Sequence, residues 1–272
     1  MNKSDDFQEN LEILLNTSKP NLQKRKQLLV KNTIKFMSAA NGFYISRMKI
    51  SEVERAIEGK DDKRGKYNLL KQAVHLMEKS EQKSSKFFKC ADNGLYLKTA
   101  LDLLKESVPE EYPYLLIAWK VQSRKTEMVG MATCVRFDND LIDEEDNKTK
   151  KILESYYNDY YYIDVLCVSD EGKGAGRLLV LTAFDIALRK GMKGVIAMSF
   201  SEDPKKTPPS LKMFTEDLKF NQIVKSSKTD TYGMFVVKDS EESFDLLNKE
   251  MLEICTRTNL NDDTKFMWKC EE

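Results

Sequence analysis

The sequence contains very little histidine and no closely spaced pairs of cysteine. Of its 272 residues only one, His75, is a histidine, so a catalytic triad could draw only on that residue, and a site with several histidine ligands is excluded. The five cysteines include no CxxC pair, so no metal site is expected. Their odd number, together with a polar, acidic segment at residues 1–10 where a signal peptide would be apolar, predicts reduced thiols and a cytoplasmic protein.

Long apolar runs, an excess of one charge and structure-breaking residues are also lacking. No run approaches the roughly 18 apolar residues of a membrane span, so no membrane partner is expected. Lys and Arg total 44 and Asp and Glu total 44, giving a net charge of zero, which disfavours nucleic acid as a partner. With 11 glycines and 6 prolines the chain is neither collagen-like nor proline-rich. A hydrophobic content of 41% suffices for a buried core.

The N-terminal part of the chain is predicted to be mostly helical. Apolar residues at helical spacing indicate helices on either side of a break at 16–20, and Asn41-Gly42 ends the second of them. We interpret residues 1–42 as a helical N-terminal extension that could form a homodimer surface. A short strand is predicted at 43–48, and further helices at 51–57, 67–77 and 97–108.

Beyond residue 112 aromatic and branched residues dominate, and strands are expected. The predicted strands are 112–122, 126–137, 160–169, 194–200, 221–225, 232–238 and a final short one at 265–269. The predicted helices are 177–190, 210–218 and 241–255, and 138–151 is predicted to be a polar loop. This order indicates an α/β (α+β) fold in which a mixed, mostly antiparallel central sheet of about seven strands is flanked by helices.

Three glycines lie in the loop between the predicted strand 160–169 and the predicted helix 177–190. Gly172, Gly174 and Gly176 carry no side chains, so backbone N–H groups could reach a phosphate there, and the start of the following helix adds positive potential. Lys173 and Arg177 supply formal positive charge. The segment therefore predicts a phosphate-bearing ligand, such as a nucleotide-like cofactor.

Two common phosphate-binding motifs do not fit this loop. A P-loop requires Ser or Thr directly after a Gly-Lys pair, which the loop lacks. A dinucleotide-binding GxGxxG motif requires a third glycine, but that position holds Arg177 or Leu179, depending on which glycine starts the count. The predicted hairpin before the loop is also unlike the start of a βαβ unit.

A third type of loop fits better. The apolar strand end and the glycine loop resemble the acetyl-CoA-binding motif of the GNAT N-acetyltransferase superfamily. The matching residues are Leu166, Cys167, Val168, Glu171, Gly172, Lys173, Gly174, Ala175, Gly176 and Arg177. The order of elements over 112–239 is also that of the family, and 213–220 (MFTEDLKF) is similar to the family segment before the last two strands. The resemblance implies a domain over 43–239, with 240–272 as a C-terminal helix and short appendage.

The resemblance further implies an N-acetyltransferase that uses acetyl-CoA as co-substrate and no metal. An amine of a small molecule or a protein would attack the thioester directly, while the backbone of residues 166–168 holds the pantetheine arm. Asp164 is the expected base, because two-residue alternation puts it on the same face as Leu166 and Val168. The tyrosine that serves as general acid in the family aligns with Thr215, or with Phe214 if the helix register shifts.

Several features depart from the family pattern: Lys219 stands where the family has Gly before the last Phe, and the loop after Val168 is about one residue shorter than usual. Glu171 stands where the family has Arg or Gln, and its charge opposes a pyrophosphate. Thr215 is a poor acid for a leaving thiolate. These departures leave open a catalytically inactive protein of the same fold that acts as an acyl-CoA-binding or protein-interaction module. A weaker alternative is acyl transfer to a nucleic-acid base, as in some members of the superfamily.

Other conspicuous residues have simpler interpretations. The tyrosines at 156, 157 and 160–162 could line an acceptor cleft, but tyrosine is also a good strand former, and we favour packing in the sheet. The acidic loop at 138–146 could attract a cationic acceptor, although charge runs mostly form solvated loops. Cys134 and Cys167 are interpreted as core residues and His75 as an ordinary helix residue.

Overall fold

The computed structural model describes residues 22–49, 76, 114–122, 125–138, 142, 145–169, 172–201, 203–228 and 231–257. Several predictions fall on other parts of the chain. The helix before residue 16, the helices at 51–57 and 97–108, the strand at 265–269, and the residues His75 and Glu171 lie outside the described residues. The helix predicted at 67–77 does so as well, except for Leu76, which is helical and buried.

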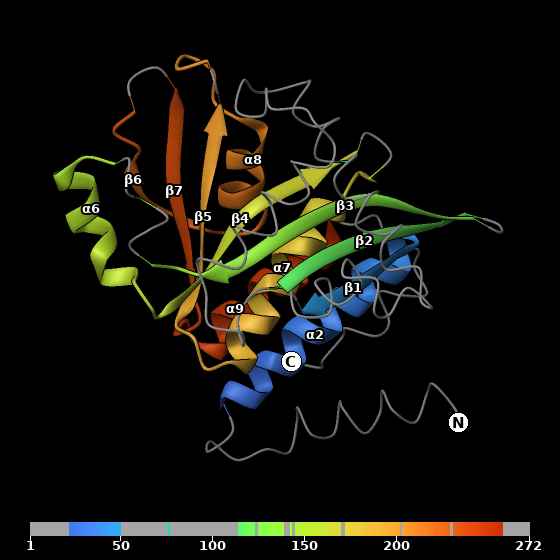
Figure 1. Cartoon of the computed structure of the whole chain (residues 1–272). Helices are drawn as coiled ribbons and strands as arrows, with labels where there is room; N and C mark the ends of the chain where they lie inside the picture. Colours follow the sequence, from blue (N-terminus) through green and yellow to red (C-terminus); the bar gives the residue numbers. More distant parts are fainter. Residues whose placement is uncertain are drawn as a thin grey trace, which may run out of the picture.

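Seven strands form a single sheet in the order β1-β2-β3-β4-β5-β7-β6. The strands are β1 (Phe43–Lys49), β2 (Tyr114–Gln122), β3 (Lys125–Arg136), β4 (Tyr160–Val168), β5 (Gly194–Ser201), β6 (Asn221–Lys225) and β7 (Tyr232–Asp239). Neighbouring strands are antiparallel except β4 and β5, which are parallel. Figure 1 shows this sheet with helices packed behind it. The predicted fold class and the element order implied by the GNAT resemblance are confirmed.

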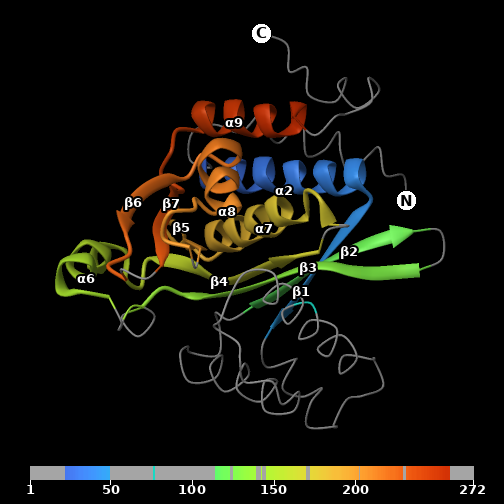
Figure 2. The same ribbon diagram turned by 90° about the horizontal axis from the view of Figure 1, so that it is seen from above.

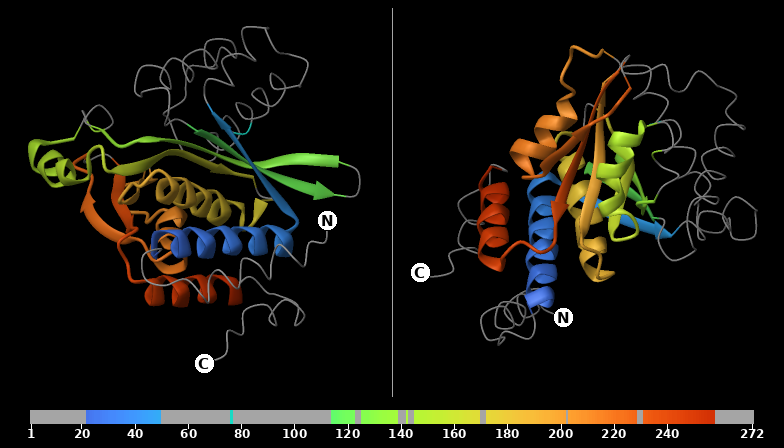
Figure 3. Two further views of the ribbon diagram at one scale, coloured as in Figure 1. Left: turned by 90° about the horizontal axis from the view of Figure 1, so that it is seen from below. Right: turned by 90° about the vertical axis from the view of Figure 1, so that its left-hand side faces the viewer.

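Most of the described helices cover one face of the sheet. They are α2 (Leu22–Asn41), α7 (Ala175–Arg189), α8 (Pro209–Lys212) with the π-helical turn η7 (Met213–Asp217) that continues it, and α9 (Phe244–Thr256). Figure 2 shows α7 next to the sheet, α2 outside it and α9 outermost. The short helix α6 (Asn147–Leu153) lies on the opposite side of the sheet from α2 and α9 (Figure 3, right). No described helix is both long and apolar enough to cross a membrane.

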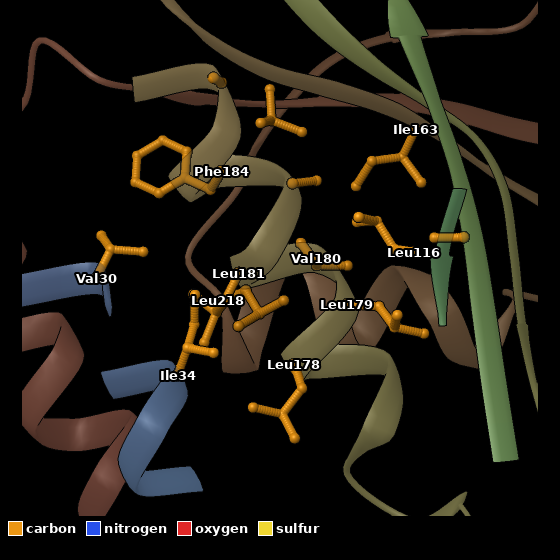
Figure 4. Packing of buried hydrophobic residues seen from close by; sticks show 14 of the residues in the cluster. Val30, Ile34, Leu116, Ile163, Leu178, Leu179, Val180, Leu181, Phe184 and Leu218 are labelled. Atoms are coloured by element: carbon orange, nitrogen blue, oxygen red, sulfur yellow. The ribbon is translucent and has the colours of Figure 1, made fainter. Parts of the chain in front are cut away.

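Helix α7 is the centre of the main core. Its side chains are buried over nearly its whole length, as expected for an apolar helix that is covered on two sides. Figure 4 shows Leu116 and Ile163 of the sheet on one side of α7, and Val30 and Ile34 of α2 on the other. Gly191, with φ of +69°, ends the helix as predicted.

Helices α2 and α9 belong to this same core. Leu29 and Met37 of α2 and Leu247 and Met251 of α9 are buried in one cluster with α7. The predicted boundary at residue 42 therefore marks a change of element and not a break in packing. The apolar side of α2 is covered by α7 and α9 and is therefore not available to a second copy of the chain. A homodimer formed through the N-terminal helices stays a prediction.

A second, smaller core lies on the other face of the sheet. It contains Phe137, Leu153 and the aromatic rings of Tyr160 and Tyr162. The prediction of a polar loop over 138–151 was wrong, because this segment contains most of α6. Asp146 caps the helix by accepting a hydrogen bond from the Thr149 N–H at 2.7 Å. Only Thr149 and Leu153 of α6 are buried, so the helix carries too short an apolar stripe to be recognised by periodicity.

The acidic loop also contains a buried carboxylate. Glu145 is 7% exposed. Its Oε1 accepts a hydrogen bond from Ser226 Oγ at 2.6 Å, and its Oε2 accepts bonds from the N–H and Oγ of Ser227 at 2.7 and 2.8 Å. Glu145 thus joins the segment before α6 to the turn between β6 and β7, and is not part of a solvated charge run.

Replacing Glu145 with alanine is expected to destabilise the protein by about 1–3 kcal/mol, because the donors of Ser226 and Ser227 would lose a buried acceptor. Urea unfolding of the purified variant measures this change. Glu154→Ala removes an exposed carboxylate nearby and is the matched control, with an expected change within about 0.5 kcal/mol. Equal effects of the two substitutions would contradict the structural role of Glu145.

Candidate functional site

The two parallel strands β4 and β5 pair only at their starts. Their register runs from Tyr160 opposite Gly194 to Ile163 opposite Ala197 and then stops. Beyond this point β4 continues beside β3, and β5 continues beside β7. Figure 1 shows the two strands close together at one end and diverging toward the other. The second halves of β4 and β5 therefore face each other without pairing.

The direction of the backbone groups in β4 follows from two hydrogen bonds to β3. The Val165 N–H donates to Thr133 Oγ1 at 3.2 Å, and the Ser169 N–H donates to the Val129 carbonyl at 2.8 Å. Because backbone groups alternate along a strand, those of Leu166 and Val168 point away from β3, toward the diverging side. Strand β4 thus offers backbone donors and acceptors to an extended ligand that carries amide groups.

A β-bulge interrupts the pairing of β3 and β4. Thr133 lies opposite Val165, but the next residue of β3, Cys134, lies opposite Ile163. Asp164 is therefore the extra residue of the bulge. A bulge shifts the alternation of side chains along the bulged strand by one residue.

This shift corrects the predicted placement of Asp164. Ile163 before the bulge and Leu166 and Val168 after it all pack against the core beside α7. Thr133 Oγ1 donates to Asp164 Oδ2 at 3.5 Å, and the β3 neighbours of Thr133 on either side belong to the α7 core, so Thr133 itself faces the other way. Asp164 consequently lies on the face of the sheet opposite Leu166 and Val168, and the expectation of a shared face was wrong.

The environment of Asp164 perturbs its carboxyl. The side chain is solvent-accessible, yet the surrounding protein displaces enough water that desolvation raises its pKa above the ordinary value, while the Thr133 hydrogen bond acts in the opposite direction. Tyr162 responds to the same surroundings, since burial and then the Asp164 charge raise the pKa of its phenol. A solvent-accessible carboxyl with a raised pKa is suited to accept a proton near neutral pH.

Helix α7 begins at the end of β4. It starts at Ala175, two positions before the predicted start, with Gly174 as N-cap at φ +92°. The Leu178 N–H donates to the Gly174 carbonyl at 3.3 Å, so the N–H groups of Ala175, Gly176 and Arg177 precede the first intrahelical bond. These groups and the helix dipole can bind an anion beside the open edge of β4.

The glycines of the loop are also required by packing within the protein. A Cβ on Gly172 would lie 2.5 Å from the Val129 carbonyl oxygen, and one on Gly176 would lie 3.2 Å from Met213 Sδ. Gly174 is needed for its positive φ. The glycines therefore bring the loop down onto β3 and η7, and their spacing alone is not a specific phosphate signal.

The charged residues of the loop have different surroundings. Arg177 Nε donates to Asp217 Oδ2 at 2.9 Å, and its Nη2 donates to the same oxygen. The side chain of Lys173 is exposed. The positive charge of Arg177 is thus largely compensated within the protein, whereas Lys173 can contact a ligand.

Neither residue predicted at the acid position presents an acidic proton toward β4. Thr215 Oγ1 donates to the Leu211 carbonyl at 2.9 Å, and Phe214 is 2% exposed and packs against Phe220 with a ring distance of 5.1 Å. Both residues lie in η7, which contacts α7 at Gly176. The use of Thr215 as the acid stays a prediction, whereas Phe214 has no proton that it could donate.

Sequence reasoning missed three residues of this region. Thr133 and Asp217 act through hydrogen bonds that depend on the register of β3 and on the packing of η7, which no local pattern reveals. The third, Ser169, directly follows β4, and its hydroxyl is buried with no hydrogen-bond partner among the described residues. An orphaned hydroxyl beside the loop fits a ligand that supplies an acceptor.

Tyr160, Tyr161 and Cys134 are buried within the sheet and its two cores. Tyr161 is fully buried and its hydroxyl donates to the Cys134 carbonyl at 3.2 Å, while the Tyr160 hydroxyl donates to Asp239 Oδ1. Sheet packing is therefore confirmed for these tyrosines. Cys134 is buried and desolvation raises the pKa of its thiol, so its core role is confirmed, whereas Cys167 on β4 is half-buried.

A pair of glycine substitutions separates backbone strain from ligand binding. Gly174→Ala and Gly191→Ala each place a side chain at positive φ, at +92° and +69°, without steric clash. Each is expected to cost about 1 kcal/mol in urea unfolding. Only Gly174→Ala should also weaken anion binding, because it disturbs the N-cap of α7. Calorimetric titration with acetyl-CoA measures this difference, and equal affinities of the two variants would contradict it.

The fold of this chain is similar to that of several solved structures. No family model and no curated protein matches the sequence. Solved structures that resemble the chain include a proposed GNAT-family acetyltransferase from Desulfovibrio desulfuricans (12% identity, TM-score 0.44, covering 72% of this chain and 98% of that one). Also similar is an acetyltransferase from Thermus thermophilus (14% identity, TM-score 0.43, covering 72% of this chain and 96% of that one). The ribosomal-protein-S18-alanine N-acetyltransferase from Escherichia coli is a third such structure (11% identity, TM-score 0.40, covering 74% of this chain and 96% of that one). Among the described residues no group of three or more metal-binding side chains was found.

Proposed function

We propose that this protein binds acetyl-CoA between β4 and β5 and transfers the acetyl group to an amine. The observation that carries the proposal is the divergence of the two parallel strands after Ile163 and Ala197. It leaves the backbone groups of Leu166 and Val168 without a partner strand among the described residues, at the end of the sheet where α7 begins. An extended amide-containing arm with a diphosphate at one end matches these two features together.

The residues present fit the parts of acetyl-CoA. The amides of the pantetheine arm can pair with the backbone of Leu166 and Val168 in the manner of an added strand. The diphosphate can accept hydrogen bonds from the N–H groups at the start of α7, with Lys173 as a charged partner. The Ser169 hydroxyl, which is buried without a hydrogen-bond partner among the described residues, supplies one further donor at the end of β4.

Asp164 is the proposed base. The attacking nitrogen must be neutral, so the ammonium form of the acceptor first gives a proton to the Asp164 carboxylate, directly or through water. The nitrogen lone pair then forms the new C–N bond at the thioester carbonyl carbon, the C–S bond breaks, and the sulfur leaves with the bonding electrons. The surplus proton of the acylated nitrogen passes to this thiolate, directly or through water, so that the products are the amide and the free thiol. A donor along the β4 backbone would stabilise the negative charge that develops on the carbonyl oxygen.

The bulge in β4 separates the two substrates. Leu166 and Val168 face the α7 side of the sheet, while Asp164 faces the opposite side. The acceptor amine is therefore proposed to approach from the face of Asp164. The negative carboxylate favours a cationic acceptor there, either an amine-bearing small molecule or a protein amino group.

One observation favours the alternative of a non-catalytic protein. The Thr215 hydroxyl is already committed to the Leu211 carbonyl, so the acid position supplies no evident proton for the leaving sulfur. In this alternative the chain binds acyl-CoA, or a protein partner, without turnover. Binding and turnover must accordingly be measured separately.

Calorimetric titration of the full chain with acetyl-CoA tests the proposal, followed by an amine-acceptor screen that monitors release of free thiol. Micromolar binding is expected. Lys173→Glu should weaken it by about tenfold or more, because one charge-assisted contact becomes a repulsion. Lys151→Glu is the matched control, since Lys151 is an exposed lysine of α6, distant from the start of α7 (Figure 1).

The outcomes separate the two candidates. Binding with thiol release in the presence of an amine supports an acetyltransferase. Binding without release for any amine supports the acyl-CoA-binding module. Absence of binding by the folded wild type, or equal effects of Lys173→Glu and Lys151→Glu, would refute the proposed site.

A further inference from the structure

An ion cluster joins the start of α7 to η7 and to the end of α9. Arg177, in the first turn of α7, donates through Nε and Nη2 to Asp217 Oδ2. The other carboxylate oxygen, Oδ1, lies 3.7 Å from Arg257 Nη1, which also donates to the Glu216 carbonyl at 3.1 Å. One carboxylate thus serves two guanidinium groups from different helices.

The cluster holds the positive charge of Arg177 in the first turn of α7, where the helix dipole disfavours a cation. A cation in the first turn of a helix is repelled by the helix dipole, and a nearby carboxylate removes that cost. The side chains of Arg177 and Asp217 are 34% and 20% exposed, so their pairing is only partly screened by water. Withdrawing Arg177 from Asp217 to reach a phosphate would break two hydrogen bonds and leave Asp217 to the longer contact with Arg257.

Two contacts place η7 against the first turn of α7. Asp217 ends the π-helical turn, and Met213 begins it. Met213 Sδ is 3.2 Å from the position of a Cβ on Gly176, while Asp217 holds the next residue, Arg177. Both ends of η7 are therefore attached to the turn whose N–H groups face the ligand.

We infer that Arg177 is a positioning residue and not a phosphate ligand, and that it acts through Asp217 to hold η7 against the first turn of α7. This inference rests on the proposed acetyl-CoA site and changes the role expected for Arg177 from the sequence. The side-chain charge for the diphosphate is then supplied by Lys173, which is exposed beside the loop.

A double-mutant cycle distinguishes the two roles by the sign of an effect. Arg177→Met and Asp217→Asn should each weaken acetyl-CoA binding by about tenfold, and the double variant should bind about as weakly as Asp217→Asn alone, because all three remove the Arg177–Asp217 interaction. Arg177→Lys should not restore affinity, since lysine lacks the planar guanidinium geometry. Lys212→Met is the matched control: it removes the exposed partner of Glu216 just before η7 and should leave affinity unchanged.

A phosphate-binding arginine gives the opposite pattern. Asp217→Asn would release Arg177 to the ligand and tighten binding, and Arg177→Lys would keep most of the affinity as a point charge. Either result overturns the inference. Calorimetry on the full chain measures all five variants under one salt concentration, because contacts with phosphate depend on salt.

Amide hydrogen exchange tests the inference without acetyl-CoA. The N–H of Leu218 donates to the Met213 carbonyl at 3.0 Å, and that of Phe220 to the Phe214 carbonyl at 2.8 Å. Both amides should exchange faster in Arg177→Met and in Asp217→Asn, but not in Lys212→Met. Unchanged exchange refutes the positioning role. If wild-type protein binds no acetyl-CoA, the proposed function fails while the exchange rates still decide the role of Arg177.

Discussion

Replacing Asp164 with asparagine is expected to lower kcat for amine acetylation by about 10²- to 10⁴-fold, the usual contribution of a general base. The affinity for acetyl-CoA should change little, because Asp164 lies on the opposite face of the sheet from Leu166 and Val168. Steady-state assays and calorimetry on the same preparation measure the two quantities. Asp159→Asn removes an exposed carboxylate just before β4 and is the control. Unchanged kcat in Asp164→Asn would exclude Asp164 as the base.

The pH dependence of activity provides a second test of Asp164. Desolvation raises the pKa of its carboxyl, and the base must be ionised, so activity should fall as pH decreases through this raised pKa. The hydrogen bond from Thr133 stabilises the charged form and lowers the pKa. Thr133→Val should therefore shift the acidic limb of the profile to higher pH. A shift to lower pH would contradict the assignment.

The Asp164 carboxyl also makes the free energy of unfolding depend on pH, and the direction of this dependence follows from its raised pKa. Since its pKa is higher in the folded than in the unfolded chain, the folded state binds more protons between the two values, and the free energy of unfolding falls as pH rises through that interval. Asp164→Asn removes this dependence. Urea unfolding of wild type and variant across the interval should show curves that separate as pH rises.

Removing both arginine partners of Asp185 is expected to cost about 3–5 kcal/mol of unfolding free energy. Asp185 of α7 is fully buried, and its Oδ2 lies 2.8 Å from Arg47 Nη2 and 2.9 Å from Arg189 Nη2. The double variant Arg47→Met/Arg189→Met leaves a buried carboxylate with neither counter-ion. Adding Asp185→Asn should recover much of the loss, because the uncompensated charge disappears.

An exposed ion pair with a similar distance between its charged atoms shows how much of the expected loss of stability depends on burial. Lys193 and Asp159 are 2.7 Å apart, but their side chains are 52% and 48% exposed. Lys193→Met should cost at most about 1 kcal/mol, because water replaces the lost partner. If the double arginine variant lost no more stability than Lys193→Met, the Asp185 cluster would not contribute as proposed.

The sequence alone predicted the strands and the main helices well, because each of these elements buries a periodic set of apolar residues. The long apolar stretch of α7 and Gly191 after its end mark that helix without any tertiary information, whereas its start at Ala175 and the positive φ of the Gly174 N-cap were seen only in the structure. Strand β4 is dense in apolar and aromatic residues, as a central strand requires. Helix α6 was missed because it is short and buries only Thr149 and Leu153.

The position of the glycine loop was predicted correctly, but the structure gives other reasons for its glycines and another role for its arginine. Gly172 and Gly176 are required by close approach to Val129 and Met213, contacts that bring distant parts of the chain together. The positive charge of Arg177 looked available to a phosphate, yet Asp217 compensates it. A sequence lists the charged residues of a loop, but only their partners determine which charges remain for a ligand.

The sequence by itself determined the order and type of the described strands and of the described helices other than α6, the position of the loop before α7, and the presence of a carboxylate on the central strand. The tertiary structure decided which face that carboxylate occupies. The extra residue of the bulge becomes visible only when β4 is paired with β3, since register is a property of two strands and not of one. Likewise, the open edge of β4 exists because β5 turns away after Ala197, which depends on how the sheet twists and packs as a whole.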